Sequence, residues 1–203
     1  MGTKINLEIY NLLTKQCHKI DFCLWRFLTC KKKIIQIQTS FSSEKVAVAI
    51  KHCTACNLHK NGKQLPYWTE HSQYILLMDV PVQGYPDYMD KFWELFREVG
   101  LSKQEFVVLH TVQCHTKMTK RMGKPHYTMP SRSHREECRP WLHAYLKELG
   151  RTKMLVMGNV PMEHMIGEFN GIKEKNATVV TPKMCGIPVP CVLSVSPSFL
   201  KNQ

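Results

Sequence analysis

The sequence lacks an apolar run long enough to cross a bilayer. Its longest candidate, residues 20–28, is short and contains the charged residues Asp21 and Arg26. The same segment lacks the small-residue cleavage site of a secretory signal. We therefore expect an intracellular protein, in the cytoplasm, nucleoid or nucleus, that is neither secreted nor bound to a membrane.

Without a secretory signal, structural disulfides are not expected. The chain nevertheless contains nine cysteines, an odd number. Metal ligation is therefore a better use for these thiols than disulfide pairing.

Carboxylates are scarce, because 16 Asp and Glu stand against 28 Lys and Arg and leave a formal net charge of +12. Such an excess favours a polyanionic partner, most often nucleic acid. The cations concentrate between Cys114 and Arg139, where hydroxyl and aromatic side chains are interleaved with them. The expected DNA contacts there are Lys117, Lys120, Arg121, Lys124, Arg132 and Arg135. The alternative is a solvated lysine-rich loop.

Internal repeats and low-complexity segments are also missing, and 43% of the residues are hydrophobic, enough for an ordinary core. A length of 203 residues fits one domain with an appendage. We expect the N-terminal appendage over residues 1–42 and the domain over residues 43–203.

From residue 43 onward, strand and helix patterns alternate. Short apolar runs predict strands at 74–78, 106–109, 154–157 and 189–194, the last interrupted by Pro190. Apolar positions at helical spacing predict helices around 92–99, 138–149 and 162–166. Pro140 is expected to lie in the first turn of its helix or to kink it. This alternation predicts a mostly parallel sheet covered by helices, with ligands beyond the carboxyl ends of the strands.

A tight pair of cysteines, Cys53 and Cys56, is followed far downstream by Cys114 and Cys138. Four thiolates at these positions could close around one metal centre that joins distant parts of a domain. Zinc ribbons usually show two tight pairs, and ligation by cysteine alone also suits a [4Fe–4S] cluster. The alternative is that these are unpaired buried cysteines.

Several motifs together resemble one family. In chain order they are Cys53-Thr54-Ala55-Cys56-Asn57-Leu58, a strand ending in Asp79 and Pro81, Val112-Gln113-Cys114, Cys138-Arg139-Pro140-Trp141-Leu142, Met157-Gly158-Asn159 and a Pro197-Ser198 turn. This resembles the iron–sulfur branch (family 4) of the uracil-DNA glycosylase superfamily over roughly residues 51–200. Residues 117–142 are most similar to the X-type members, in which an inserted basic loop ends in a histidine, here His126.

The resemblance implies a three-layer α/β/α sandwich with a central, mostly parallel sheet. It also implies a structural [4Fe–4S] cluster on Cys53, Cys56, Cys114 and Cys138, with zinc as the alternative metal. His115, beside Cys114, is the nearest alternative ligand.

The family's catalytic motifs are mostly substituted here. Its acidic motif Gly-Glu-x-Pro-Gly reads Met78-Asp79-Val80-Pro81-Val82, in which Asp79 could still activate a water. The amide that reads the uracil edge falls at His110, and the late His-Pro-Ser motif reads Ser196-Pro197-Ser198. A hydroxyl therefore replaces the imidazole that would stabilise the departing uracil anion, and such a donor is typically worth about 3–4 kcal/mol.

The other base-pocket candidates are Asn159 and one of two tyrosines, Tyr85 or Tyr88, as the ring that stacks on a flipped base. His126 could trap the deoxyribose covalently, or be an ordinary surface histidine. Ser198 is a DNA-contact candidate. Phe199 and Leu200 are either an apolar wedge for the gap left by a flipped base or part of the core.

The sequence therefore predicts a DNA-binding accessory of replication or repair that keeps the fold and has lost or altered base excision. Its expected partner is DNA that is single-stranded or has a flipped base, and base flipping is expected to be part of its action. It could also bind a replication or repair protein. One rival function is an active uracil-DNA glycosylase with a covalent step at His126. Another is a protein–protein scaffold with a basic face.

Overall fold

The structure is a computed structural model, which describes residues 42–69, 71–81, 88–121, 124–149, 153–167, 171–184 and 187–202. The expected appendage, residues 1–42, lies outside this part of the chain except for its last residue. Tyr85 also lies outside it, as does Gly150, which is expected to end the helix around 138–149. No helix in the described part is both long and apolar enough to cross a membrane.

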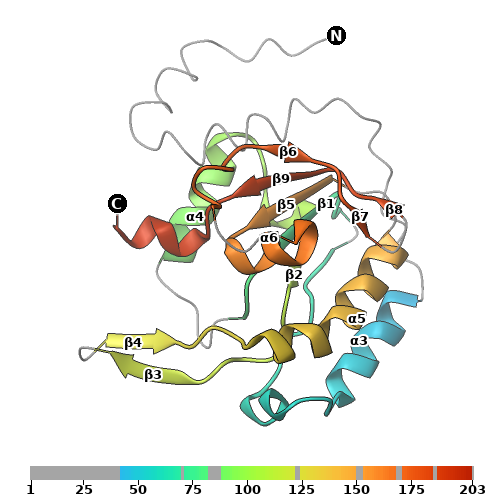
Figure 1. The fold of residues 1–203 in the computed structure, drawn as a ribbon. Helices are drawn as coiled ribbons and strands as arrows, with labels where there is room; N and C mark the ends of the chain where they lie inside the picture. The colour runs from blue at the N-terminus through green and yellow to red at the C-terminus, as the bar shows by residue number, and fades with distance from the viewer. Residues whose placement is uncertain are drawn as a thin grey trace.

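A five-stranded sheet forms the centre of the molecule, in the order β2-β1-β5-β9-β6 (Figure 1). Its strands are β1 (Tyr74–Met78), β2 (Phe106–His110), β5 (Lys153–Met157), β9 (Cys191–Ser194) and β6 (Val179–Val180). The first four pair in parallel, and the short β6 pairs antiparallel with β9. The expected mostly parallel sheet is confirmed.

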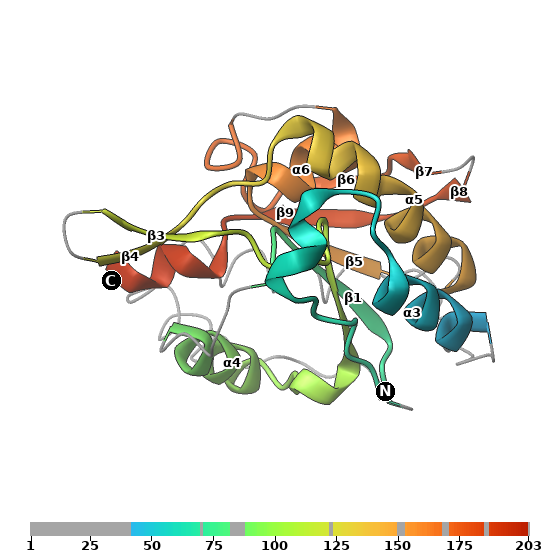
Figure 2. The same cartoon turned by 90° about the horizontal axis from the view of Figure 1, so that it is seen from below.

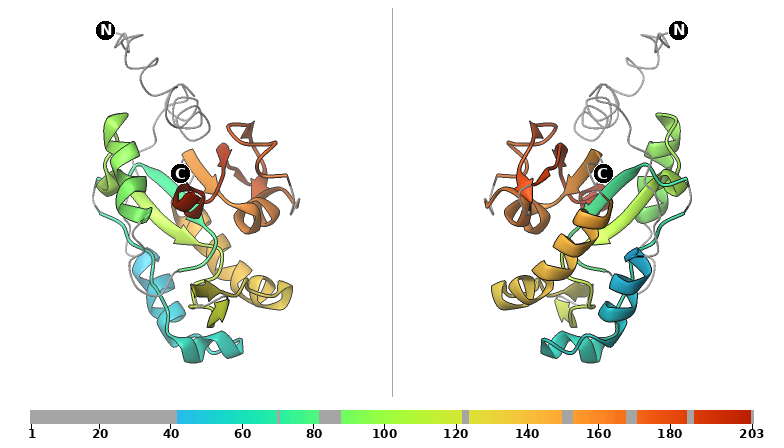
Figure 3. Two further views of the ribbon diagram at one scale, coloured as in Figure 1. Left: turned by 90° about the vertical axis from the view of Figure 1, so that its left-hand side faces the viewer. Right: turned by 90° about the vertical axis from the view of Figure 1, so that its right-hand side faces the viewer.

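Helices cover both faces of this sheet, because its strands alternate between two apolar cores. On one side Ile75 and Leu77 of β1 pack with α3 (Ser42–His52), α5 (Arg132–Leu149) and α6 (Asn159–Ile166). On the other, Tyr74 and Leu76 pack with α4 (Tyr88–Glu98), against which the short helix η3 (Pro197–Asn202) also lies. Figures 2 and 3 show α4 and α5 on opposite sides of the sheet. The α/β/α sandwich is therefore confirmed.

Two strand and helix boundaries differ from the sequence prediction. Helix α5 begins at Arg132, so Pro140 lies in its interior rather than in its first turn. The earlier start is possible because Ser131 caps the helix, as described below. The last strand begins at Cys191, after Pro190, because a proline has no N–H to donate to a neighbouring strand.

The predicted basic loop is a hairpin instead of a loop. Strands β3 (Met118–Arg121) and β4 (Lys124–Tyr127) pair antiparallel and project from the body of the molecule (Figure 1). The remaining short elements are η1 (Asn57–Asn61), η2 (Lys103–Glu105), and the pair β7 (Lys183–Met184) and β8 (Ile187–Pro188).

Candidate functional site

Successive strands are added first on one side of β1 and then on its other side, so β1 and β5 flank a switch point in the strand order. From β1 the chain moves outward to β2, and it then returns to the other side of β1 to form β5 and β9. In open parallel sheets the crevice beyond such a switch point is the usual ligand site. Asp79 follows β1 here, and Gly158 follows β5.

The Asp79 carboxylate packs directly against the backbone of Gly158. A Cβ placed on Gly158 would lie 2.7 Å from Asp79 Oδ1. The carboxylate accepts a hydrogen bond from the backbone N–H of Val160, in the first turn of α6. Asp79 therefore binds the N-terminus of α6, where a negative charge is favourable.

Burial nevertheless raises the pKa of Asp79 to about 7, and the Val160 hydrogen bond only partly offsets this. Its Oδ1 has no hydrogen-bond partner among the described residues. A carboxyl group with a pKa near neutrality can accept or release a proton at physiological pH. Asp79 therefore combines a structural role with the capacity for acid–base chemistry.

This pKa predicts how stability depends on pH. The native state holds the Asp79 proton more tightly than the unfolded chain does. The stability that this proton contributes is therefore fully present below about pH 4 and is lost as the pH rises through 7. The side chain of Asp79→Asn cannot ionise. We therefore expect the free energy of unfolding of this variant, relative to that of wild type, to rise by about 2–4 kcal/mol as the pH is raised from 4 to 8. Urea denaturation across this range measures the difference. Asp90→Asn, at an exposed site on α4, is the control, and parallel curves for Asp79→Asn and wild type would contradict the assignment.

His110, at the end of β2, is almost entirely enclosed. Its side chain is 3% exposed, and burial, assisted by His115, lowers its pKa to about 4. Its Nδ1 has no hydrogen-bond partner in the described part of the chain, while its carbonyl accepts a 2.6 Å bond from Gln113 Nε2. His110 is therefore a neutral, buried side chain at the expected edge of the sheet.

Two further base-pocket candidates are used by the local structure. The Oδ1 of Asn159 accepts the backbone N–H of Ile172 at 3.3 Å, which attaches α6 to the following segment. Ser196 Oγ lies 3.0 Å from Ser198 Oγ and 3.4 Å from the Ser198 nitrogen, at the start of η3. Both side chains therefore have structural partners.

The structure describes the aromatic candidates only in part. Tyr85 lies outside the described residues, and Tyr88 begins α4, although the position of its side chain is not described. Phe199 packs against the α4 core, with Lys173 Nζ 5.9 Å from its ring centre. Of the two interpretations of Phe199, its packing favours a core residue over a wedge.

The structure brings three of the four predicted cysteine ligands together, because Cys114 and Cys138 are buried among apolar neighbours and the partly buried Cys56 packs against them. Backbone hydrogen bonds hold the first two segments together. His115 N–H donates to Gly62 O at 3.1 Å, and Gln64 N–H donates to Gln113 O at 2.9 Å. Cys138 comes from α5, and the backbone of Gln113 bonds to its thiol.

Cys53 lies within electrostatic reach of these three cysteines. Burial raises the pKa of Cys114 to about 11, and Cys138, Cys56 and Cys53 add to the effect, while Lys63 opposes it. The Lys63 ammonium donates to the carbonyls of Lys51 at 3.0 Å and Cys53 at 2.5 Å, so it is fixed beside the thiols. The four sulfurs and one cation therefore share one corner of the molecule.

The thiols form a donor set that suits a metal centre by its chemistry, since both an iron–sulfur cluster and zinc take four cysteine ligands. Within the described ranges, no group of three or more His, Cys, Asp or Glu side chains is arranged to hold a metal ion.

The hairpin carries three of the seven predicted DNA-contact residues. Lys117 is exposed just before β3. Lys120 and Arg121 lie on β3, and Lys124 and His126 on β4, where His126 pairs in register with Thr119. Only the backbones of these four strand residues are described. The backbone therefore places these residues on one projecting element.

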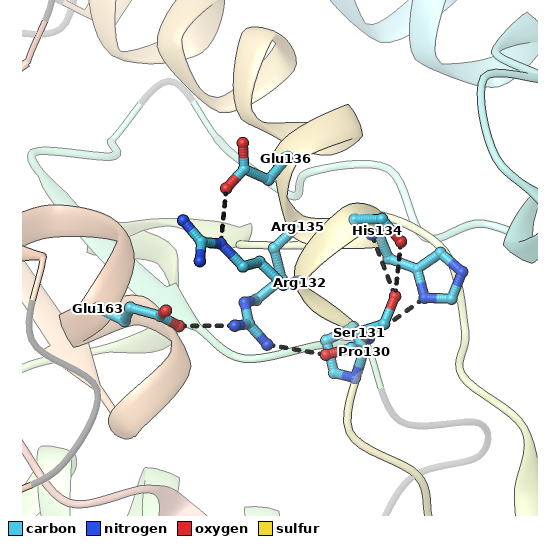
Figure 4. Close-up of polar contacts among 8 residues, drawn as sticks. Pro130, Ser131, Arg132, His134, Arg135, Glu136 and Glu163 are labelled. Carbon is cyan, nitrogen blue, oxygen red and sulfur yellow. Dashed lines mark hydrogen bonds and ion pairs between the residues drawn. The ribbon is translucent and has the colours of Figure 1, made fainter.

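The two arginines of α5 differ from each other, as Figure 4 shows. Arg132 is exposed and pairs with Glu136 at 3.2 Å. Arg135 is only 14% exposed, because it bonds to Glu163 of α6 at 2.9 Å and to the carbonyl of Pro130 at 2.9 Å. Arg135 thus joins two helices, whereas Arg132 lies at the surface.

His134 is a structural residue that the sequence analysis missed. Its N–H donates to Ser131 Oγ, and its Nδ1 accepts the N–H of Ser131, both at 3.3 Å (Figure 4). This is a capping box with histidine in the usual place of glutamate, so the spacing Ser-x-x-His was the available signal. Since Nδ1 is the acceptor, Nε2 carries the proton and donates to Asn57 Oδ1 at 2.9 Å. His134 therefore links α5 to the segment that follows Cys56.

A family model described as the uracil DNA glycosylase superfamily matches residues 58–203. The matched span contains all five strands of the central sheet, the hairpin, Cys114 and Cys138, and it begins just after Cys53 and Cys56. A search of curated proteins finds no match.

Proposed function

Because this chain belongs to the uracil DNA glycosylase superfamily, we propose that it binds DNA at unpaired or flipped bases and has lost or altered the family's base excision. We further propose that it belongs to the iron–sulfur branch and serves as an accessory of DNA replication or repair. Its partner would be single-stranded DNA or a duplex with a displaced base.

The observation that carries this proposal is how the polar side chains at the carboxyl edge of the sheet are bonded and buried. Asp79 binds the N-terminus of α6, Asn159 binds the backbone of Ile172, and Ser196 bonds to Ser198. His110 is neutral and buried. Among the described residues, the side chains at the base-reading and uracil-releasing positions are thus substituted or hold the local structure together, which favours binding over excision.

The hairpin supports the DNA-binding part of the proposal. Its basic residues lie on an element whose backbone projects from the body of the molecule, and phosphate contacts are made by such residues. Arg135 is better assigned to the fold than to DNA, because its guanidinium is already bonded to Glu163 and Pro130. Ser198 is exposed at the start of η3, where its N–H already bonds to Ser196.

A [4Fe–4S] cluster on Cys53, Cys56, Cys114 and Cys138 would act as a cross-link rather than as a reactant. It would join the end of α3, the loop after β2 and the middle of α5. The Lys63 ammonium, held by two carbonyls, would offset the negative charge of four thiolates.

One observation favours the rival function of an active glycosylase. The Oδ1 of Asp79 has no hydrogen-bond partner within the described chain, and its pKa of about 7 suits a general base. It also lies at the switch point, where a substrate would bind.

A gel assay on single-stranded uracil-containing DNA separates these functions. We expect no uracil release at rates typical of the family, and no denaturation-resistant adduct, because nothing in the described site stabilises a departing uracil anion. His126→Ala is the matched variant. Robust release by wild type would establish the glycosylase instead, and an adduct that disappears in His126→Ala would establish a covalent step.

DNA binding itself is tested by its salt dependence. Replacing Lys120, Arg121 and Lys124 together by Ala should weaken binding to every sequence and flatten the slope of log affinity against log salt by roughly two to three units. Fluorescence anisotropy at several salt concentrations measures the slope. An unchanged slope would show that the DNA-binding surface does not include the hairpin.

A further inference from the structure

Two segments of the chain that lack acidic residues meet in the corner that holds the cysteines. Residues 45–69 and residues 106–135 contain no aspartate or glutamate. The first segment contains four Lys or Arg and the second contains six, so together they account for ten of the twelve net positive charges. The positive charge is therefore concentrated on α3, η1, and the hairpin with its flanking segments, and the rest of the chain is almost neutral.

Hydrogen bonds hold these two segments side by side. Asn61 Nδ2 donates to the carbonyl of His115 at 3.0 Å. The backbone N–H of Gln64 donates to the carbonyl of Gln113 at 2.9 Å, and the N–H of His115 donates to that of Gly62 at 3.1 Å. The segment that contains η1 is thus fixed to the segment that leads into the hairpin.

Three exposed lysines form a row along this corner. Lys117 and Lys60 border the same cavity, so the base of the hairpin and η1 present neighbouring cations. Three residues after Lys60, the Lys63 ammonium donates to the carbonyl of Lys51 at 3.0 Å, which places the end of α3 next in the row. Among the described residues, no carboxylate forms an ion pair with Lys51, Lys60 or Lys117.

Lys63 covers the one feature of this corner that would repel an anion. The C-terminus of a helix carries partial negative charge on its unpaired carbonyls. At the end of α3, the Lys63 ammonium donates to the carbonyls of Lys51 and Cys53. A cation therefore caps these carbonyls, and the end of α3 is a surface that a phosphate can approach.

The cations at the start of α5 are less available. Arg132 pairs with Glu136 at 3.2 Å, and Arg135 pairs with Glu163 at 2.9 Å. A carboxylate beside each guanidinium competes with a phosphate for it. The row of unpaired cations therefore leads from the hairpin toward η1 and α3 rather than along α5.

We propose that the DNA-binding surface continues from the hairpin across η1 to the end of α3, and that Lys60 and Lys51 contact phosphates of the strand that the hairpin binds. The inference rests on the proposed DNA binding and extends it to two residues that the sequence analysis did not assign. A row of cations without carboxylates complements a phosphate backbone, and such contacts position a strand without reading its sequence. The strand would pass over residues 53–56, which connect α3 to η1.

Fluorescence anisotropy with a labelled oligothymidylate of about 16 nucleotides, at several salt concentrations, tests this path. The double variant Lys51→Gln/Lys60→Gln removes two charges and keeps side chains of similar polarity. We expect it to weaken binding and to flatten the slope of log affinity against log salt by roughly 1.4 units, because each phosphate contact to a single strand contributes about 0.7 units.

The matched control is Lys147→Gln/Lys183→Gln, which lowers the net charge by the same amount. Both lysines are exposed, one in the last turn of α5 and the other on β7, at the opposite end of the molecule from the hairpin (Figures 1 and 2). This variant should leave the slope unchanged. Equal flattening in the two double variants would show that the protein's overall charge acts from a distance, and it would overturn the proposed path.

The hairpin triple variant separates this inference from the proposed function. If the triple variant flattens the slope and Lys51→Gln/Lys60→Gln does not, the extended path is overturned while the DNA binding stands. If the wild type does not bind the strand, both are overturned.

Acetylation of surface lysines, read by mass spectrometry, gives an independent measurement on the wild-type protein. Bound oligothymidylate should slow the modification of Lys51 and Lys60 and leave that of Lys183 unchanged. Protection of both lysines would support the path. Modification of Lys51 and Lys60 at the same rate with and without the strand would overturn it, whatever the salt dependence of the variants.

Discussion

Gly158→Ala is expected to lower the free energy of unfolding by about 3–4 kcal/mol. Gly158 has φ +108° and ψ 170°, a conformation that is essentially restricted to glycine. The new Cβ would also lie 2.7 Å from Asp79 Oδ1, in a place where the carboxylate is fixed by α6. Strain and steric overlap therefore act together at the switch point. Urea denaturation at pH 7 measures the loss.

Gly100→Ala is the matched control for this substitution. Gly100 also has a positive φ, +78°, but a Cβ there meets no atom within 4 Å. Its cost should come from the left-handed backbone conformation alone, about 1–2 kcal/mol. Equal losses in the two variants would show that contact with Asp79 adds nothing. The double variant Asp79→Ala/Gly158→Ala should recover part of the loss, because it removes the overlap and leaves the strained φ.

The second large effect concerns the proposed iron–sulfur cluster. Cys138→Ser should reduce the iron content from about four atoms per chain and bleach the visible absorption. It should also destabilise the protein by on the order of 3–5 kcal/mol, because it removes a ligand from a centre that cross-links three segments. Metal analysis, absorption spectra and denaturation of aerobically purified protein measure these changes.

Cys191→Ala is the control, since Cys191 is a buried thiol in β9 that packs in the core beside α5 and α6. It should retain the iron and lose only packing energy. Stoichiometric zinc without iron in the wild type would show that the four cysteines bind a single zinc ion instead of a cluster. Wild-type protein with neither metal would leave Cys138 as a buried cysteine and contradict the cluster.

The sheet could be predicted from the sequence because its strands are short apolar runs in which both faces are buried. Runs such as 74–78 and 106–109 correspond to β1 and β2 almost to the residue. The helical stripe from Phe92 to Val99 likewise matches α4, since its apolar residues recur at helical spacing. Local pattern alone was sufficient for these elements.

The site was less predictable, because its contacts join residues far apart in the chain. The sequence indicated Asp79 as an acid, but its bond to Val160 depends on β5 returning beside β1. Arg135 was expected at the DNA surface, and its ion pair with Glu163 depends on how α5 and α6 pack. The hairpin had a local signal, two β-forming stretches around Gly123, which the density of cations obscured.

The central sheet also protects its own margins against self-association. An open edge strand exposes unpaired N–H and C=O groups, on which a second chain can pair and aggregate. On one margin, β6 adds only two residues outside β9, and so short a strand is a poor template. On the other, Tyr67 exchanges two backbone hydrogen bonds with Val108 of β2 and interrupts that edge. A basic protein that gathers on a polyanion at high local concentration would benefit from such blunted edges, because crowding would otherwise promote strand exchange between neighbouring copies.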